Sequence, residues 1–256
     1  MQGSFIWYEL LTTDMTAAGR FYRSVIGWDV NTEAMGGDYQ LFEVPGAGRA
    51  VGGMMLLTEE MKRDGVPPNW TGYVEVDDVD AMAARFRELG GTVRKGPAEI
   101  PGIGRFAVVG DPQGAVILIF KPYPMENAPP PVTMSPGFVG WHELYAADGA
   151  AALDFYGKVF GWTRHDVMDM GAMGKYYLFA VNGQLTGGMM DKPTEMPMPA
   201  WGYYFIVDDI DAACRRVKDG GGTIVEEPME VPDGFAAQAR DPQGAWFGLA
   251  GPRIAK

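Results

Sequence analysis

Two glutamates occupy matching places in segments that are otherwise apolar and rich in strand-forming residues. Glu9 lies within residues 5–11, and Glu143 lies within Trp141-His142-Glu143-Leu144. A carboxylate that leaves water on such a strand must be paired, hydrogen-bonded or protonated. Two interpretations follow: a salt bridge or tyrosine hydrogen bond that holds the structure together, or a functional carboxylate that acts as a general base or ligand anchor.

The equivalence of these glutamates belongs to a duplication of the whole chain. The paired motifs are Trp7-Tyr8-Glu9-Leu10 with Trp141-His142-Glu143-Leu144, Phe21-Tyr22 with Phe155-Tyr156, Gly27-Trp28 with Gly161-Trp162, Gly52-Gly53 with Gly187-Gly188, and Asp111-Pro112-Gln113-Gly114-Ala115 with Asp241-Pro242-Gln243-Gly244-Ala245. The offset is 134 residues at the first pair and 130 at the last. A repeat this regular predicts two pseudo-symmetric domains.

Each half contains a fainter repeat of strand, helix and three strands. In the first half we expect strands near 5–11, 28–34, 38–44, 50–57, 73–76, 92–99, 105–109 and 115–120. Asp14 and Asp78 are placed to cap helices that end at Gly27 and Gly90-Gly91. The second half follows the same course, which gives four βαβββ units.

Composition limits the partners and the compartment. The formal charge of −12 disfavours nucleic acid and anionic membrane surfaces as partners. The single Cys214 suits a reducing compartment, and no stretch approaches the ~20 apolar residues of a membrane helix. We therefore expect a cytoplasmic protein. The prolines of residues 123–136 predict an extended linker between the halves.

The four βαβββ units and the shared order of these motifs resemble the vicinal oxygen chelate superfamily, which includes glyoxalase I, bleomycin-resistance proteins and extradiol dioxygenases. The resemblance is strongest to tandem glyoxalase-like proteins. It implies an α+β fold of two tandem domains, each a cupped mixed sheet with helices outside, paired within one chain as a monomeric pseudo-dimer. The domains would cover residues 1–122 (units 3–58 and 70–122) and 137–256 (units 137–191 and 200–252).

Catalytic members of that family hold a divalent metal in the cup through His, Glu or Gln. The family's usual ligand positions correspond here to Trp7, Thr71 and Leu118 in the first half and to Trp141, Gly202 and Gly248 in the second. The corresponding strands after the paired glycines carry Met and Leu. None of these is a usual ligand for a catalytic divalent ion. We therefore expect no metal cofactor of the usual kind.

Strand alternation then indicates what the cups contain instead. The first cup would hold Trp7, Glu9, Tyr73 and Glu75, and the second would hold Trp141, Glu143, Tyr204, Ile206 and Trp246. Gly202 and Gly248 would open space for an aromatic side chain or a ligand. His142 alternates out of phase with Glu143 and is expected away from the cup, and His165 is expected in solvent. The rings either fill the barrel or stack on a planar ligand.

Three functions remain in view. The favoured one is a small-molecule-binding protein of the glyoxalase and bleomycin-resistance type, with Glu9 and Glu143 as candidate catalytic groups and Trp7, Tyr73, Glu75, Trp141, Tyr204 and Trp246 as candidate ligand contacts. The alternative is a metal-dependent lyase, isomerase or dioxygenase whose atypical ligands come from Glu9, Glu75 or Glu143. The third is a non-catalytic interaction protein with closed cups. Whether any reaction is catalysed stays open.

Overall fold

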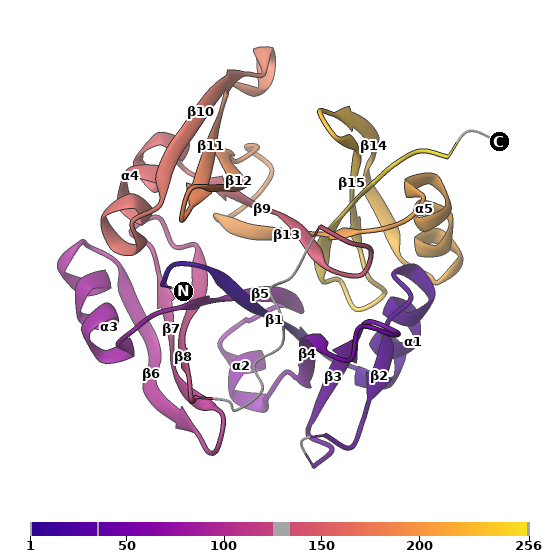
Figure 1. Ribbon diagram of the computed structural model, residues 1–256, viewed down its shortest axis with the longest axis horizontal. Helices are drawn as coiled ribbons and strands as arrows, with labels where there is room; N and C mark the ends of the chain where they lie inside the picture. The colour runs from indigo at the N-terminus through magenta and orange to yellow at the C-terminus, as the bar shows by residue number, and fades with distance from the viewer. Residues whose placement is uncertain (1, 35, 125–133, 255–256) are drawn as a thin grey trace. The chain divides into compact units, whose positions relative to one another are not determined.

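The protein is built from four successive βαβββ repeats, as the sequence predicts (Figure 1). The computed structural model describes residues 2–34, 36–124 and 134–254. The first repeat comprises β1 (Phe5–Thr12), α1 (Met15–Val25), β2 (Asp29–Asn31), β3 (Tyr39–Glu43) and β4 (Ala50–Leu56). The second comprises β5 (Asn69–Glu75), α3 (Val79–Glu88), β6 (Thr92–Ile100), β7 (Gly104–Gly110) and β8 (Val116–Pro122).

The second half of the sequence repeats this order. The third repeat comprises β9 (Val139–Ala146), α4 (Gly149–Phe160), β10 (Thr163–Asp169), β11 (Lys175–Val181) and β12 (Gln184–Asp191). The fourth comprises β13 (Ala200–Ile206), α5 (Ile210–Asp219), β14 (Thr223–Val231), β15 (Gly234–Arg240) and β16 (Trp246–Gly251). Residues 125–133 of the predicted linker lie outside the described residues.

Two local features differ from the sequence prediction. The strand expected over 28–34 is the three-residue β2, and Asn31 ends it by accepting backbone N–H bonds from Glu33 and Ala34 at 3.1 Å each. The short helices α2 (Glu59–Arg63) and η1 (Gly171–Met173) were not anticipated. Thr58 caps α2 through its bond from the Met61 N–H, a signal present in the sequence. None of the described helices is long and apolar enough to span a membrane.

An aspartate begins each of the four long helices. Asp14, Asp78, Asp148 and Asp209 all have extended backbones, and their side chains accept N–H bonds from the first helical turn. Such a cap satisfies donors that have no partner within the helix. The repeated Asp residues therefore fix where each helix begins, and hence the direction in which the chain leaves the preceding strand.

The strands form two mixed sheets of eight. Their orders are β2-β3-β4-β1-β5-β8-β7-β6 and β10-β11-β12-β9-β13-β16-β15-β14. The pairs β1–β4, β5–β8, β9–β12 and β13–β16 are parallel, and the hairpin-linked pairs are antiparallel. This is the α+β class with mixed sheets that the sequence predicts.

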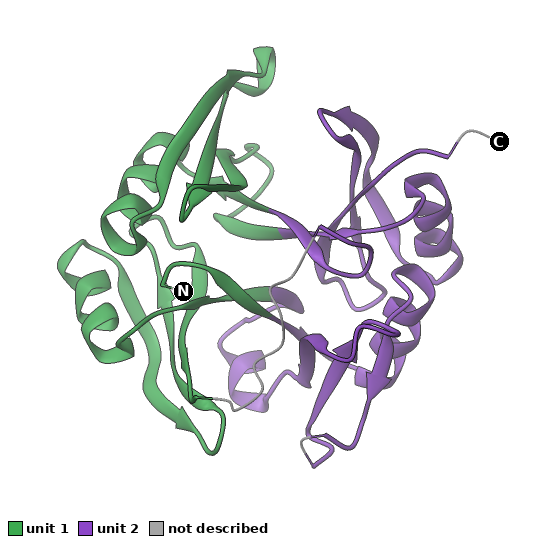
Figure 2. Ribbon diagram, viewed as in Figure 1, with its two compact units in different colours: residues 1–7, 71–128, 142–202 green, residues 8–70, 129–141, 203–256 purple. Residues whose placement is uncertain are grey.

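Tertiary contacts divide the chain into two compact units, and each unit draws on both halves of the sequence (Figure 2). Unit 1 contains Met1–Trp7, Thr71–Ala128 and His142–Gly202, and unit 2 contains Tyr8–Trp70, Pro129–Trp141 and Tyr203–Lys256. Unit 1 therefore holds the second and third repeats almost entire, while unit 2 holds most of the first and fourth.

Helices of different sequence halves pack together inside each unit. In unit 1, the Phe86 ring of α3 lies 5.4 Å from Phe155 and 5.7 Å from Phe160, both on α4. In unit 2, the Arg216 guanidinium of α5 donates to the Val25 carbonyl oxygen of α1 at 2.7 Å. The Phe21 ring of α1 also lies against Gly220 at the end of α5, so an aromatic ring packs between the paired helices in both units.

Candidate functional site

In unit 2, the Phe-Tyr and Asp-Pro-Gln-Gly motifs meet in one buried hydrogen-bond chain. Trp70 Nε1 donates to the Tyr22 hydroxyl at 2.8 Å, and that hydroxyl donates to Asp241 Oδ2 at 3.1 Å. The other carboxylate oxygen of Asp241 accepts the backbone N–H groups of Gln243 and Ala245 at 2.9 Å each. Burial raises the pKa of the Tyr22 phenol well above its ordinary value. Trp70 is buried, and its indole N–H is used within this hydrogen-bond chain.

Unit 1 contains the same chain. Trp201 Nε1 donates to the Tyr156 hydroxyl at 3.2 Å, and Tyr156 donates to Asp111 Oδ2 at 3.2 Å. Burial raises the pKa of Asp111 above its ordinary value, although its backbone hydrogen bonds oppose the shift, and the pKa of Asp241 behaves likewise. In each unit, two of the most regular motifs of the sequence come from different halves of the chain and are joined by this hydrogen-bond chain.

The tryptophans of the Gly-Trp motifs also anchor chain segments. Trp28 Nε1 donates to the Gly137 carbonyl oxygen at 2.8 Å, and Trp162 Nε1 donates to that of Gly3 at 2.8 Å. Both glycines have positive φ, near +86° and +85°. Any other residue would be strained there, so these glycines are required by the backbone.

Within unit 1, the sheet face that carries Tyr73 is packed with its own apolar side chains. We call this surface, formed by β5, β7 and β8, the first face. Its buried members are Tyr73, Leu118 and Phe120, with Trp7, Ile6, Ile100, Phe106 and Val108 packed against them. Glu75 pairs with Phe120 across β5 and β8 and is partly buried. The structure thus brings Trp7 and Tyr73 together in a hydrophobic cluster.

Within unit 2, the equivalent surface of β13, β15 and β16 is lined differently, and we call it the second face. Trp246 Nε1 donates to Gln238 Oε1 at 3.2 Å, and Gln238 Nε2 donates to the Tyr204 hydroxyl at 3.0 Å. Gly248 lies directly beneath Tyr204, because a Cβ built there would be 2.3 Å from Tyr204 Cδ1. The space expected over Gly248 is therefore occupied by an aromatic ring.

Aligning the Asp-Pro-Gln-Gly-Ala motifs shows how the two faces diverged. Leu118 corresponds to Gly248 and Phe120 to Ala250. At both positions the first face has a large apolar side chain where the second face has a small residue or glycine. The remaining differences are Val116 against Trp246, Phe106 against Ala236, and Val108 against Gln238. The first face is filled by aliphatic and aromatic groups, whereas the second carries the hydrogen-bonded Trp246, Gln238 and Tyr204, with the Tyr204 ring over Gly248.

Glu143 is buried in unit 1, where only 7% of its surface is exposed. Its Oε1 accepts a hydrogen bond from the Tyr176 hydroxyl at 2.8 Å. The Tyr176 ring lies over Gly188, where a Cβ would be 2.1 Å from its Cζ, and Gly188 pairs with Glu143 across the parallel strands β9 and β12. The tyrosine hydrogen bond considered from the sequence is therefore present.

Glu9 has a similar setting in unit 2. It pairs with Gly53 across β1 and β4, and the Tyr39 ring covers Gly53, where a Cβ would be 2.3 Å from Tyr39 Cε1. Glu9 is partly buried, unlike the fully buried Glu143. The paired glycines of the repeat thus make room for a tyrosine beside each glutamate.

The histidines lie where the sequence predicts. His142 is buried, its ring stacks on Phe5 at 3.9 Å between centroids, and its Nδ1 lies 3.0 Å from the Thr186 carbonyl oxygen. Burial lowers the pKa of His142 to about 4, so it is neutral at neutral pH. His165 is exposed on β10. Trp141 is partly buried on β9.

The residues at the family's metal positions do not fit a divalent ion. Leu118 packs between Tyr73 and Phe120, and Gly248 lies under the Tyr204 ring, so neither position presents a donor atom. Among the described residues, no three His, Cys, Asp or Glu side chains gather closely enough to hold a metal ion.

Sequence reasoning missed two side chains that organise these surfaces. Gln238 links Tyr204 to Trp246, and Tyr176 binds Glu143. Tyr176 had an available signal, because a bare Gly-Gly pair in a neighbouring strand commonly marks a close approach by another group. Gln238 had none, since a lone glutamine on a strand is unremarkable.

The fold and these surfaces define a tandem βαβββ protein of the glyoxalase type. The model of the Glyoxalase/Bleomycin resistance protein/Dioxygenase superfamily matches residues 4–119 and 138–249. The chain therefore belongs to this superfamily, as an intrachain pseudo-dimer of two glyoxalase domains.

Curated relatives match along nearly the whole chain. "Putative glyoxylase CFP32" of Mycobacterium tuberculosis (strain CDC 1551 / Oshkosh) is 32% identical over 255 residues, which cover 98% of this chain and 95% of that protein. "Anthracycline biosynthesis protein DnrV" of Streptomyces peucetius is also 32% identical, over 257 residues that cover 96% and 92%.

Solved structures support the fold. The Mn(II)-bound glyoxalase from Novosphingobium aromaticivorans aligns with a TM-score of 0.66 and 16% identity, over 99% of this chain and 83% of that one. The 2,2',3-trihydroxybiphenyl 1,2-dioxygenase from Sphingomonas wittichii aligns with a TM-score of 0.64 and 15% identity, over 100% and 92%. At these identities the likeness shows the fold alone.

Proposed function

We propose that the protein binds a planar aromatic small molecule on the second face, without the divalent metal that catalytic relatives of this fold use. The observation that carries the proposal is the hydrogen-bonded series Trp246–Gln238–Tyr204 lying over Gly248. It provides two aromatic rings whose orientations are fixed by a shared amide.

The chemistry of the second face suits such a ligand. Aromatic rings offer large apolar area and stacking surfaces, and a few placed polar groups orient a molecule in an otherwise apolar site. Gly248 allows the Tyr204 ring to lie directly against the sheet, whereas the equivalent position of the first face is filled by Leu118. We assign Trp7, Tyr73 and Glu75 to a structural role, because Trp7 and Tyr73 pack in the apolar cluster of the first face and Glu75 pairs with Phe120 at its edge.

Glu143 remains the candidate acid–base group of unit 1, and Glu9 its counterpart in unit 2. A buried carboxylate held by a tyrosine is positioned to accept a hydrogen bond from a ligand hydroxyl or to take its proton. Glu143→Gln keeps the shape and removes the charge, so it separates these uses from simple packing.

The relatives named for anthracycline biosynthesis guide the choice of probe. We expect hydroxylated anthraquinones to raise the melting temperature of the purified protein. Trp246→Ala should weaken binding by about tenfold, since one stacked ring contributes roughly 1–3 kcal/mol. The matched control is Val116→Ala, the equivalent position of the first face, which should leave the response intact.

Two results would contradict the proposal. One is a melting temperature that no aromatic compound shifts across a broad library. The other is near-stoichiometric Mn²⁺, Fe²⁺, Zn²⁺ or Ni²⁺ in protein purified without a metal-affinity tag, lost on Glu9→Gln or Glu143→Gln, which would favour the metal-dependent alternative.

A further inference from the structure

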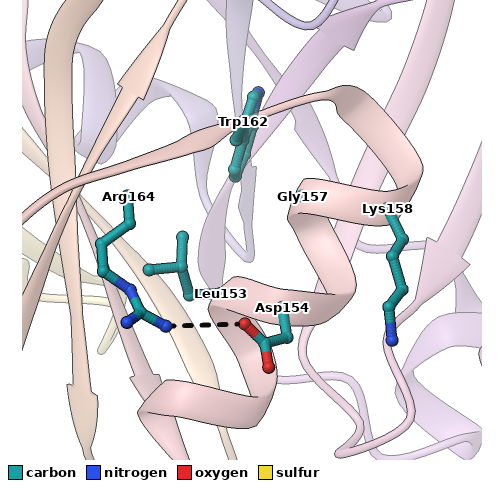
Figure 3. A pocket seen from close by; sticks show the side chains of 6 residues that line it. All are labelled: Leu153, Asp154, Gly157, Lys158, Trp162 and Arg164. Atoms are coloured by element: carbon teal, nitrogen blue, oxygen red, sulfur yellow. Dashed lines mark ion pairs between the residues drawn. The ribbon is translucent and has the colours of Figure 1, made fainter.

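Helix α4 borders a surface pocket in unit 1 that the proposed function does not use. The pocket has a volume of about 420 Å³, within the range of small-molecule sites. It is lined by Leu153, Asp154, Gly157, Lys158, Trp162 and Arg164 (Figure 3). Four of these belong to α4, and the other two lie at and just before the start of β10.

The duplicated repeat shows why the pocket exists. When the repeats are aligned on their shared Phe-Tyr and Gly-Trp motifs, Gly157 is equivalent to Arg23, and Arg164 is equivalent to Val30. In unit 2, Arg23 fills the equivalent place with a long side chain that pairs with Asp29 at 3.2 Å. Gly157 has no side chain, and a Cβ built there would lie 3.1 Å from the Trp162 carbonyl oxygen, so the backbone at Trp162 approaches α4 closely at this point.

The strand residue beside the helix also differs between the two repeats. In unit 2, Val30 packs onto α1, since its Cγ2 would lie 3.3 Å from a Cβ on Gly19. In unit 1 the corresponding strand position carries Arg164, whose guanidinium reaches outward to Asp154. Gly19 of α1 corresponds to the buried Leu153 of α4, so both repeats carry an apolar side chain here, on the strand in unit 2 and on the helix in unit 1, and the strand position in unit 1 carries a cation.

The charges of the pocket favour an anion. Arg164 and Asp154 form an ion pair of 3.7 Å, with 54% and 66% of their side chains exposed, so the pair is weak and readily exchanged for another carboxylate. Figure 3 shows these two side chains facing each other beside Leu153, with Lys158 extending on the far side of Asp154. Two cations and one carboxylate give this spot a positive balance on a chain of net charge −12.

A second hollow shares two of these side chains. It has a volume of about 300 Å³ and is lined by Leu89, Pro112, Ala151, Asp154, Phe155 and Lys158. Asp154 and Lys158 therefore border both hollows.

We propose that this α4 pocket binds a small organic carboxylate with an apolar body. The carboxylate takes the place of Asp154 against the Arg164 fork and is also approached by Lys158, a geometry that suits planar bidentate pairing. The apolar body lies over Gly157 against Leu153 and the edge of Trp162.

Benzoate titrated into the full-length protein, followed by amide and indole NMR signals, tests the proposal. We expect saturable shifts at Gly157, Arg164 and the Trp162 indole. Arg164→Val, which restores the residue of the first repeat, should weaken binding about tenfold or more, as loss of a charge-assisted pair does. Gly157→Arg should fill the pocket and remove the shifts, and Arg23→Gly on α1 is the matched control that should change nothing.

Benzamide and inorganic phosphate complete the design. Benzamide should bind far more weakly because it lacks the charge, and phosphate should bind weakly because it lacks the apolar body. The proposal is overturned if benzoate gives no saturable shifts, if Arg164→Val binds it as the parent does, or if phosphate binds as well as benzoate. Since none of these residues belongs to the second face, either result is independent of the proposed function.

Discussion

The first face of unit 1 and the second face of unit 2 come from equivalent repeats, yet they carry different side chains at aligned positions. On the first, Leu118 and Phe120 pack with Tyr73 in a closed apolar cluster. On the second, the Tyr204 ring lies over Gly248, and Gln238 links Tyr204 to Trp246. The two faces therefore keep a buried tyrosine in common but differ in the side chains that surround it, and the proposed function rests on this difference.

The frame behind both faces did not diverge. Each unit keeps a Trp–Tyr–Asp hydrogen-bond chain and a Trp–Gly anchor with nearly the same distances. Other parts did change: the strand after the first helix is the three-residue β2 in unit 2 and the seven-residue β10 in unit 1. The shared frame makes paired substitutions informative, because a change in one unit has a control in the other.

The largest loss of stability is expected at the Trp–Tyr–Asp hydrogen-bond chain that both units share. Asp111→Ala and Asp241→Ala should each lower the free energy of unfolding by about 3–4 kcal/mol, because two turn N–H groups and a buried tyrosine hydroxyl lose their acceptor. Urea denaturation measures this, with the exposed Asp219→Ala as control. A large loss for one aspartate and none for the other would show that the frames are not equivalent.

A pH effect should distinguish the halves. The pKa of His142 is lowered to about 4 in the folded protein, so the unfolded state binds the proton first and stability falls as pH drops from about 6.5 to about 4. The full effect is about 3 kcal/mol for a shift of this size. Burial raises the pKa of Asp111 and Asp241, which acts in the opposite direction, so a difference measurement is needed.

His142→Tyr, which introduces the equivalent residue of the first half, isolates the pH dependence of stability that comes from His142. Denaturation of parent and variant across this pH window should show the parent losing about 3 kcal/mol of stability relative to the variant as the pH falls from about 6.5 to about 4. Parallel curves would contradict a buried neutral histidine.

Cavity formation should separate the two faces. Leu118→Ala should destabilise the protein by about 2–3 kcal/mol, because Leu118 is buried among apolar neighbours. Ala250→Gly, at the second face, should cost about 1 kcal/mol or less, since little packing is lost. Thermal unfolding measures both, and equal costs would mean that the second face is packed as closely as the first.

The smallest expected effect concerns the glutamine of the repeated turn. Gln113 exchanges two hydrogen bonds with the Asp148 backbone, at 2.9 and 2.7 Å, whereas the buried Gln243 Oε1 has no hydrogen-bond partner among the described residues. Gln113→Leu should therefore cost about 1 kcal/mol, and Gln243→Leu should be neutral or slightly stabilising. Equal losses at the two positions would remove this asymmetry.

Much of the fold was predictable because its signals are local. Capping aspartates, helix-ending glycines and strand alternation act within a few residues, so Asp14 and Asp148 locate their helices without tertiary information. The short β2 was overestimated because Asn31 turns the chain by bonding its own backbone, which competes with the strand.

The candidate surfaces were harder to predict because they depend on partners far apart in sequence. Alternation placed Tyr204 and Trp246 on one side of their strands, but the link through Gln238 requires the register of β15 against β16. Likewise, the motifs gave no sign that Tyr22 would meet Asp241 and Tyr156 would meet Asp111. Such pairings are fixed by topology.

Equilibrium titration with quinizarin, a dihydroxyanthraquinone, tests whether the second face binds a planar aromatic ligand, using the parent protein, Gly248→Leu and Leu118→Ala. We expect one bound ligand per chain and near-parental affinity in Leu118→Ala. In Gly248→Leu the affinity should fall by about tenfold or more, because the new side chain displaces Tyr204. Binding that survives Gly248→Leu, or that is lost in Leu118→Ala, would contradict this expectation.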